Sequence, residues 1–331
     1  DDYKKADVWS NEDAKIAFLA ADAGIGVETI FYRVGGGAFS DYQLPIEIHD
    51  EGTQRIQYYA QDRLGNKELT KILTVKIDKT PPVIDVNPEV TSEAASVLTP
   101  VNLPHPFIKD DLDSAVELGT EHVSKDGYPL GTTRVLYKAV DHAGNNASAF
   151  TDVNIVDSTP PQVTLNAPAE GSYAAHTVAV SGKVKEIFLK TLFINGEEVD
   201  VVDGQFTKTI PVTGDTFLIE LKAEDTSRNE SMVSRTISRD ILPPGTDHDY
   251  AYDGAWTQEN AHITLSALDA ESGVKTTYYR EGNEPVLEYR RPIDIRKEGK
   301  YTIEYYSTDK VGNEEGHRKI AVWIDQAPPA V

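Results

Sequence analysis

Apolar and polar residues alternate strictly in four short segments that are spread along the chain. Each segment ends at an aspartate: 56–62, 135–141, 219–225 and 303–309. A period of two with the apolar residues on one side is the pattern of a half-buried β-strand. Further alternating runs follow, such as Leu73–Ile77, and no stretch combines a helical period with helix caps. The pattern therefore predicts an all-β chain of short strands.

Two sequence landmarks recur with a period near 80 residues. An Asp-x-x-x-Asn motif begins at Asp62, Asp141, Asp225 and Asp309, so the aspartates are 79, 84 and 84 residues apart. A Pro-Pro step follows each motif, and the first prolines, at positions 81, 160, 243 and 328, are 79, 83 and 85 residues apart. A shift of 247 residues aligns positions 9–82 with 256–329 without a gap and with about 30 identities. Two independent markers thus divide the chain into four repeats.

Each repeat has the signals of a β-sandwich. Short strands with turn residues over about 80 positions are typical of a seven-stranded immunoglobulin-like (Ig-like) sandwich. A Pro-Pro step favours extended backbone and suits a stiff connection between units. We therefore expect four tandem Ig-like domains in an elongated array, with limits at 1–80, 81–159, 160–243 and 244–331. These ranges are called repeats 1 to 4 below.

Composition narrows the function classes. The chain has 32 Lys and Arg against 54 Asp and Glu, a formal charge of −22. Such acidity argues against a nucleic-acid binder and against docking on an anionic membrane, since both need a basic surface. The lack of cysteine excludes disulfides, thiolate metal sites and cysteine nucleophiles. The sequence has no run of 18 apolar residues that would predict a membrane span. No signal peptide opens the sequence, so we expect a mature form or an excised fragment.

The repeated polar turns carry the candidate chemistry. In one interpretation they are plain turns, in which glycine takes a positive φ and Asp or Asn caps local backbone donors; Arg228 replaces that glycine in repeat 3, so a different turn is expected there. In the other, their oxygens and the aspartates near the Pro-Pro steps bind Ca²⁺ and tie one repeat to the next. The turns lack the dense Asp-x-Asp-x-Asp ladder of a strong loop site, and both interpretations stay open. The candidate Ca²⁺ ligands are Asp62, Asn66, Asp78, Asp141, Asn145, Asp157, Asp225, Asn229, Asp240, Asp309, Asn313 and Asp325.

A few other residues stand out. The acidic stretches 110–113 and 247–249 are expected to be solvated loops. Trp323 lies between Val322 and Ile324, which the alternation points inward, so its side chain is expected on the outer face of a strand, where it could contact a ligand or partner. Trp9 and Trp256 occupy equivalent positions and are expected to be packing groups.

Catalysis has little support in the sequence. It contains no Gly-x-Ser-x-Gly elbow, no His-Glu-x-x-His motif and no phosphate-binding glycine loop after a strand. Paired carboxylates for glycoside cleavage are possible among so many acids. However, a sandwich of this size leaves little room for a cleft, so we expect no enzyme activity.

Whole motifs of the chain resemble a known group of modules. The Tyr-Tyr-x-x-Asp-x-x-Gly-Asn-x-Glu pattern at 58–68 and 305–315, followed by Ile-Asp and Pro-Pro, resembles the tandem Ig-like repeats of bacterial secreted and cell-surface proteins. Repeat 2, with Tyr-Pro-Leu-Gly-Thr-Thr at 128–133, is similar to hyalin-repeat modules. Repeat 3, with Val-Ser-Gly-Lys-Val at 180–184, resembles Ig-like modules attached to bacterial glucan-degrading enzymes.

The resemblance implies a function outside the cell. It points to a non-catalytic stalk, spacer or adhesion module of a larger bacterial secreted or surface-attached protein. The alternative is a carbohydrate-binding accessory region of a secreted polysaccharide-degrading enzyme or protease, for which an exposed aromatic such as Trp323 would be the marker. The partners implied are flanking domains of the same polypeptide and cell-wall or extracellular polysaccharide or protein, and neither nucleic acid nor a membrane.

Overall fold

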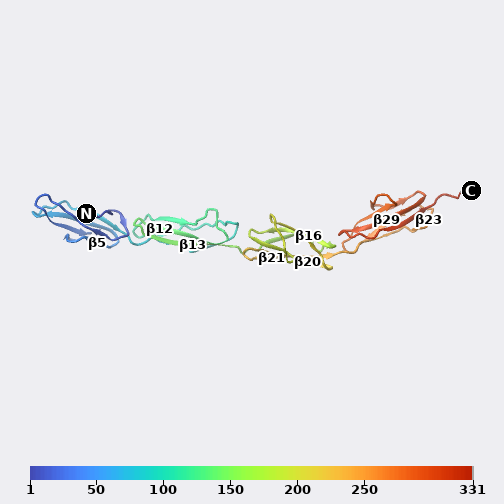
Figure 1. The fold of residues 1–331 in the computed structure, drawn as a ribbon, viewed down its shortest axis with the longest axis horizontal. Helices are drawn as coiled ribbons and strands as arrows, with labels where there is room; N and C mark the ends of the chain where they lie inside the picture. The colour runs from blue at the N-terminus through green and yellow to red at the C-terminus, as the bar shows by residue number, and fades with distance from the viewer. Residues whose placement is uncertain (330–331) are drawn as a thin grey trace. The chain divides into compact units, whose positions relative to one another are not determined.

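The computed structural model describes residues 1–329, and its regular structure consists of β-strands (Figure 1). Within this described part there is no helix, and so none that could cross a membrane. Contacts divide the chain into two compact units, residues 1–157 and 158–331. The prediction of an all-β chain of tandem Ig-like sandwiches is confirmed.

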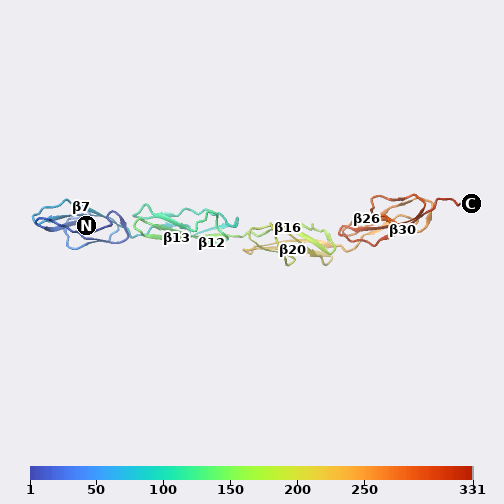
Figure 2. The ribbon, with the colours of Figure 1, turned by 45° about the horizontal axis from the view of Figure 1, so that its top comes forward.

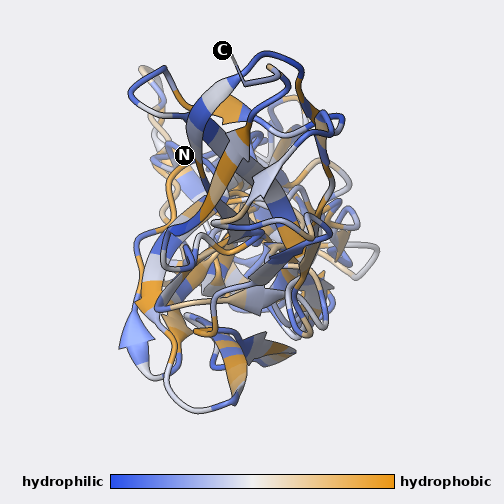
Figure 3. Ribbon diagram, turned by 90° about the vertical axis from the view of Figure 1, so that its right-hand side faces the viewer, coloured by the Kyte–Doolittle hydropathy of each residue, from blue (hydrophilic) through white to orange (hydrophobic). Residues whose placement is uncertain are grey.

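Within the described residues, buried apolar side chains form four separate clusters, one in each repeat. They centre on Ile56 in repeat 1, Tyr137 in repeat 2, Leu221 in repeat 3 and Ile303 in repeat 4. The alternation seen in the sequence places these side chains inward, and the change from hydrophilic to hydrophobic positions along the strands can be followed in Figure 3. The residue limits of the repeats stay predictions.

Repeat 1 has a five-stranded sheet of order β1-β7-β6-β3-β4 and a two-stranded sheet of β2 and β5. The long strand β6 ends at Asp62, the first residue of the polar turn. The strands of repeat 1 are β1 (Trp9–Ser10), β2 (Ala14–Ile16), β3 (Val27–Val34), β4 (Ser40–Asp41), β5 (Ile46–Ile48), β6 (Gly52–Asp62) and β7 (Lys71–Ile77).

Repeat 2 has a four-stranded sheet of order β11-β12-β13-β9 and a two-stranded sheet of β10 and β8. The strands β12 and β13 form one long antiparallel pair, which Figure 2 shows side by side. The strands of repeat 2 are β8 (Val83–Asp85), β9 (Glu89–Glu93), β10 (Phe107–Lys109), β11 (Glu117–Glu121), β12 (Gly131–Val140) and β13 (Asn146–Val156).

Repeat 3 has sheets of order β14-β16-β19 and β15-β21-β20-β17-β18. Gly182, in the middle of β16, lies where a Cβ atom would come within 2.1 Å of the Thr164 carbonyl oxygen and 2.5 Å of the Phe206 ring. The strands of repeat 3 are β14 (Gln162–Ala167), β15 (Tyr173–Ala174), β16 (Thr177–Lys185), β17 (Leu189–Ile194), β18 (Glu197–Glu198), β19 (Gln205–Pro211), β20 (Thr216–Asp225) and β21 (Glu230–Arg239).

Repeat 4 has the same five-stranded sheet as repeat 1, with order β23-β30-β29-β26-β27, and its pair β24-β28 corresponds to β2 and β5 of repeat 1. The pair β22-β25 forms a further two-stranded sheet of repeat 4. The strands of repeat 4 are β22 (Gly245–His248), β23 (Trp256–Thr257), β24 (Ala261–Ile263), β25 (Leu265–Leu268), β26 (Val274–Glu281), β27 (Leu287–Glu288), β28 (Ile293–Ile295), β29 (Gly299–Asp309) and β30 (Arg318–Ile324).

The last strand of each repeat pairs in parallel with an early strand of the same repeat. The pairs are β1 with β7, β9 with β13, β15 with β21 and β23 with β30. The last strand then leads directly to the aspartate before the Pro-Pro step. Each repeat therefore has a turn end, which carries the Asp-x-x-x-Asn turn, and a proline end, from which the chain leaves.

Candidate cation sites where repeats meet

The Asp-x-x-x-Asn turn has one geometry in all four repeats. In repeat 2, the Asp141 carboxylate accepts the Asn145 backbone N–H through Oδ1 and the Asn145 side-chain Nδ2–H through Oδ2, both at 2.8 Å. Asp62 and Asn66, Asp225 and Asn229, and Asp309 and Asn313 repeat this pair of bonds. The plain-turn interpretation therefore describes the local structure correctly, since Asp and Asn satisfy backbone donors of the turn.

The expectation of a different turn in repeat 3 is wrong. Arg228 adopts a positive φ of 71°, where Gly65, Gly144 and Gly312 have 88°, 94° and 100°. The Asp225–Asn229 hydrogen bonds hold the arginine in the left-handed region, although its Cβ makes that region costly. The side-chain contacts of the turn, and not its glycine, fix its shape.

In two of the turns the asparagine also reaches the proline end of the preceding repeat. Asn145 Nδ2 donates to the carbonyl of Asp78 at 2.8 Å. In the same way, Asn313 Nδ2 donates to the carbonyl of Asp240 at 3.1 Å. Within each unit, the turn end of one repeat is thus bonded to the proline end of the repeat before it.

Three carboxylates gather at the joint of repeats 1 and 2. Oxygens of Asp78, Asp110 and Asp141 lie within 4.8 Å of one another. Asp78 is 1% exposed and Asp141 is also buried. Asp110 Oδ1 accepts the backbone N–H groups of Leu112 and Asp113, at 2.9 and 2.7 Å. Its other oxygen, Oδ2, is buried and accepts no hydrogen bond.

A second group of the same composition lies at the joint of repeats 3 and 4. Oxygens of Asp240, Asp269 and Asp309 lie within 4.8 Å of one another, and Asp240 and Asp309 are fully buried. Asp269 Oδ1 accepts the Gly273 N–H at 2.5 Å, so Asp269 closes a turn of its own. Each group thus takes one aspartate from the proline end of one repeat and two from the turn end of the next.

The charge at these groups is unbalanced. Among residues 1–329 none of the six aspartates forms a salt bridge. Burial, together with the charges of Asp110 and Asp141, raises the pKa of Asp78 above its usual range. Burial alone would also raise the pKa of Asp240, but hydrogen bonds from Ser272 and Leu242 outweigh it and lower that pKa. Three carboxylates this close repel one another unless a cation lies between them.

The donor set fits Ca²⁺. This ion takes 6–8 oxygen ligands at about 2.3–2.6 Å, so two of its ligands lie at most about 5 Å apart. The carboxylate oxygens of both groups meet that limit. The unpaired, buried Oδ2 of Asp110 is an acceptor without a donor, which a cation would satisfy. These observations make the two aspartate groups candidate cation sites.

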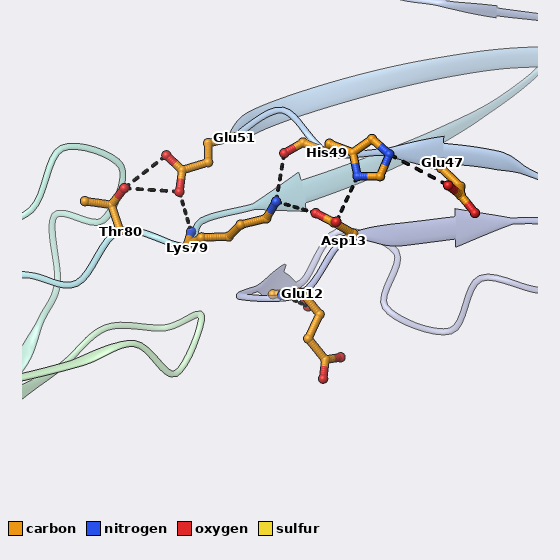
Figure 4. A network of polar contacts seen from close by, with 8 residues as sticks. Glu12, Asp13, Glu47, His49, Glu51, Lys79 and Thr80 are labelled. Carbon is orange, nitrogen blue, oxygen red and sulfur yellow. Dashed lines mark hydrogen bonds and ion pairs between the residues drawn. The ribbon is translucent and has the colours of Figure 1, made fainter.

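A polar network fastens the chain segment between repeats 1 and 2 on the side of repeat 1 (Figure 4). Glu51 accepts the Lys79 backbone N–H at 2.7 Å and the Thr80 hydroxyl at 3.0 Å. The Lys79 ammonium donates to the His49 carbonyl and pairs with Asp13, which in turn contacts the His49 ring at 2.8 Å. The segment that follows Asp78 is therefore held in place by repeat 1 itself.

Within residues 1–329, the remaining predicted aspartate ligands belong to no further group of three carboxylates. Asp62 and Asn66 form the turn of repeat 1. The ligands predicted for repeats 2 and 3 fall in different units: Asp157 is in unit 1, and Asp225 and Asn229 are in unit 2. Asp325 accepts the Ala327 N–H at 3.2 Å at the proline end of repeat 4, as Asp78 accepts the Thr80 N–H at 3.1 Å. Their role as ligands stays a prediction.

Sequence reasoning missed one member of each group. The stretch 110–113 was expected to be a solvated loop. That is wrong for Asp110, because its carboxylate lies in the first aspartate group. It is also wrong for Asp113, which is buried and contacts His142. Asp269 is aligned with Asp22 between repeats 4 and 1, and both carboxylates close the same loop. That shared aspartate was the available signal.

Trp323 lies on the outer face of its strand, as the alternation predicts. Val322 and Ile324 are buried, and Trp323 between them is half-buried. Its ring centroid lies 5.9 Å from that of Trp256, and Lys300 Nζ lies over both rings, at 4.5 and 5.3 Å. The expectation that Trp256 is a packing group is wrong, because its side chain is 53% exposed. Its strand partner on β30 is Trp323, which lies on the outer face and therefore does not bury Trp256.

Two family models match parts of the chain. Residues 77–155 match the HYR domain, and residues 161–241 match domain B of glucodextranase. These matches agree with the hyalin-like character of repeat 2 and with the resemblance of repeat 3 to modules of glucan-degrading enzymes. Neither match covers half of the chain.

Similar curated proteins are longer than this chain. Hyalin of Strongylocentrotus purpuratus is 26% identical over 87% of this chain and 25% of its own length. Hyalin of Lytechinus variegatus is 32% identical over 37% of this chain and 24% of its own length. The chain therefore spans about a quarter of the length of these relatives.

Solved structures with some similarity to this chain include immunoglobulin domains of Sidekick-1 and the insect immune protein hemolin. Sidekick-1 immunoglobulin domains 1–5 are 11% identical, with 96% of this chain and 77% of that chain covered and a TM-score of 0.33. The insect immune protein hemolin is 9% identical, with 97% and 98% covered and a TM-score of 0.25. The family matches and the strand topology together indicate that the chain is a tandem Ig-like repeat region.

Proposed function

We propose that this chain is a non-catalytic spacer and adhesion region of a larger bacterial secreted or surface protein, and that Ca²⁺ bound where repeats meet stiffens it. The observation that carries the proposal is the pair of aspartate groups, Asp78–Asp110–Asp141 and Asp240–Asp269–Asp309. Each group draws on two consecutive repeats, so a cation there joins them directly. Repeat arrays are stabilised through contacts between neighbours, and a shared ion adds to those contacts.

The aspartates that sequence reasoning missed give the sharpest test. Asp110→Asn and Asp269→Asn each keep the oxygen that accepts the backbone N–H groups, but lose the carboxylate charge. Titration calorimetry of the full chain with CaCl₂ is expected to lose one binding equivalent in each variant and two in the double variant. Asp22→Asn is the matched control, since Asp22 closes the equivalent loop of repeat 1 but belongs to neither of the two aspartate groups. Equal binding by all variants, or no binding by the unaltered chain, would overturn the calcium proposal.

A second candidate function is favoured by the tryptophan pair. Trp256 and Trp323 offer adjacent indoles on the outer face of repeat 4, and aromatic faces of this kind stack on sugar rings. The match of repeat 3 to glucodextranase domain B supports a role beside a polysaccharide-degrading enzyme.

Glycan-array binding separates this candidate from the spacer alone. Trp323→Ala and Trp256→Ala are expected to abolish binding to a polysaccharide that the unaltered chain retains. Trp9→Ala is the matched control, because Trp9 holds the equivalent position in repeat 1 with Lys76 as its strand partner. An array without any bound glycan would remove the carbohydrate function and leave the spacer untouched.

A further inference from the structure

The outer side of the large sheet in repeat 1 combines aromatic and basic side chains. In its three central strands, β3, β6 and β7, the buried residues alternate with residues that point outward. Residues directly opposite each other on paired strands share a face, and Tyr59 lies opposite Phe31 just as Thr53 lies opposite Lys76. Within the described strands, none of the outward residues between these two pairs is acidic. This outer side of β3, β6 and β7 is called the basic face below.

Aromatic rings form the centre of the basic face. The rings of Phe31 and Tyr59 stack with centroids 5.1 Å apart, and Phe39 meets Tyr59 edge-on at 5.0 Å. The Arg33 guanidinium lies 4.7 Å from the centre of the Phe39 ring, and Lys67 Nζ lies 5.3 Å from the centre of the Tyr59 ring. Three rings and two cations therefore form one connected surface.

The positive charges of this face are not neutralised by the protein. Four of its basic side chains form no salt bridge with residues 1–329: Arg33, Arg55, Lys67 and Lys76. Arg33 Nε donates to the amide oxygen of Gln57 at 2.6 Å, and Lys76 Nζ donates to the Asp7 carbonyl at 3.0 Å. The edge strand β4 adds one acid, Asp41, opposite Phe31. The face is thus positive in a chain whose formal charge is −22.

The ring pair recurs in repeat 4. Tyr278 and Tyr306, the counterparts of Phe31 and Tyr59 under the shift of 247 residues, stack with centroids 5.1 Å apart. The interplanar angles are also alike, 26° in repeat 4 and 25° in repeat 1. The two sheets therefore present equivalent outer surfaces, and their charges can be compared position by position.

The charges of the two surfaces differ at one central position. Glu304 of repeat 4 takes the place of Gln57. It accepts a hydrogen bond from Arg280, the counterpart of Arg33, at 2.8 Å and pairs with Lys319 at 3.5 Å. The sheet accommodates either residue, so the unpaired cations of repeat 1 are not a requirement of the fold.

The size of the basic face indicates what kind of partner it suits. Three strands about 4.8 Å apart and about seven residues long, at about 3.3 Å each, cover about 15 by 23 Å, or about 350 Å². A stable contact with another protein buries about 800 Å² on each side. The face is small for such a contact, but a single extended polymer chain with repeated acidic groups can follow it.

We infer that the basic face of repeat 1 binds an acidic polysaccharide. Its carboxylates pair with Arg33, Arg55, Lys67 and Lys76, and its sugar rings lie against the stacked aromatic rings. Charges farther away than the Debye length, about 8 Å at physiological salt, are screened, so the local charge of the face governs the contact. This site is separate from the tryptophan pair of repeat 4 and needs no calcium.

Polygalacturonate, which carries a carboxylate on every sugar, is the probe. Calorimetry of the full chain with short polygalacturonate in chelator is expected to show saturable binding. The affinity is expected to fall about tenfold or more in about 1 M NaCl, where the Debye length is about 3 Å. The methyl-esterified polymer keeps the sugar rings without the charge and is expected not to bind. No binding of polygalacturonate, or equal binding of the ester, would overturn the inference.

A substitution taken from repeat 4 tests the location of the site. Gln57→Glu gives the basic face the acid that repeat 4 has there, and is expected to weaken binding about tenfold, because the new carboxylate pairs with Arg33 and repels the polymer. Gln205→Glu, at an exposed position of repeat 3, makes the same change of net charge and is expected to bind as the unaltered chain does. Arg55→Gln, also at an exposed position, is expected to weaken binding about threefold or more. Equal binding by Gln57→Glu and Gln205→Glu would contradict the assignment.

Two further comparisons identify the ligand class and the face. Polyglutamate carries its carboxylates on a peptide backbone and is expected to bind about tenfold more weakly, because it has no sugar rings to lie against Phe31 and Tyr59. Equal binding of polyglutamate would overturn the choice of a polysaccharide. Trp323→Ala, which alters the tryptophan pair of repeat 4, is expected to leave the binding unchanged. A loss of binding in Trp323→Ala without a loss in Gln57→Glu would place the site in repeat 4 and contradict the inference.

Discussion

At the scale of single residues, the turn of repeat 3 shows how far side-chain contacts can impose a backbone conformation. Arg228 has a φ of 71°, in a region that glycine enters freely and an L-residue with a Cβ does not. The Asp225–Asn229 bonds hold it there. The turn therefore carries strain in repeat 3 that the other repeats avoid.

Arg228→Gly is expected to stabilise repeat 3 by about 1 kcal/mol, because it removes this strain. Gly312→Ala, which places a Cβ at a φ of 100° in the equivalent turn of repeat 4, is expected to destabilise that repeat by about 1–2 kcal/mol. Thermal unfolding of both variants measures the two effects. A loss of stability in Arg228→Gly would show that the contacts of the arginine side chain stabilise repeat 3 by more than the backbone strain destabilises it.

A second residue-scale feature is the ion cluster on the outer face of repeat 4. Glu304 bonds His317 at 2.9 Å and Arg280 at 2.8 Å, and these contacts lower the pKa of Glu304 to about 2. The hydrogen bond with Glu304, and a weaker one with Glu314, raise the pKa of His317. The His317 ring also stacks on Tyr306, with centroids 3.9 Å apart.

This cluster predicts a pH dependence with a definite sign. A raised pKa means that folded His317 holds its proton more tightly than unfolded His317, so its stabilisation is complete below about pH 6.5 and is lost as the pH rises through the raised value. The effect is small, about 0.5 kcal/mol or less, because the imidazole is largely exposed. Relative to His317→Gln, the unaltered chain is expected to lose stability as the pH rises above about 6.5. Glu304, with a pKa of about 2, does not titrate in this range. Curves of stability against pH that run parallel for the two proteins would contradict the prediction.

At the scale of elements, the central strand of the smaller sheet in repeat 3 depends on a glycine. Strand β16 pairs with both β14 and β19, and Gly182 is the strand partner of Leu165 on one side and of Phe206 on the other. A methyl group there would overlap the Thr164 carbonyl oxygen, which belongs to the backbone and cannot turn aside.

Gly182→Ala is therefore expected to destabilise repeat 3 by about 1–3 kcal/mol through overpacking. Gly36→Ala is the control, since a Cβ at Gly36 meets no atom within 4 Å and the residue has no positive φ. Denaturant unfolding of the full chain reports both. Similar midpoints for the two variants would contradict the packing described for β16.

The elements also show what the sequence could and could not predict. The alternation before Asp62, Asp141, Asp225 and Asp309 placed the long strands and the turns correctly, because side-chain period and turn chemistry are local properties. Asp110 and Asp269 could not be assigned to the aspartate groups in this way. Their neighbours, Asp78 and Asp240, come from the preceding repeat, and contacts between separate segments are fixed by the folded arrangement alone.

At the scale of the whole molecule, each unit is built from two repeats whose ends share aspartates and an asparagine bond. The Asn145 and Asn313 amides bind the carbonyls of Asp78 and Asp240, and the three-carboxylate groups lie next to these bonds. A cation at such a joint converts mutual repulsion into a shared ligand set. Calcium is therefore expected to govern how freely one repeat moves against the next.

The absence of cysteine allows the most direct measurement of this claim. Spin labels at Thr53→Cys in repeat 1 and Ser148→Cys in repeat 2, both exposed positions, report the distance across the first joint by pulsed electron paramagnetic resonance. The distance distribution is expected to be narrow in Ca²⁺ and to broaden in chelator, and to be broad in both conditions for Asp110→Asn. A distribution of the same width with and without Ca²⁺ would contradict the claim that a shared cation stiffens the joints.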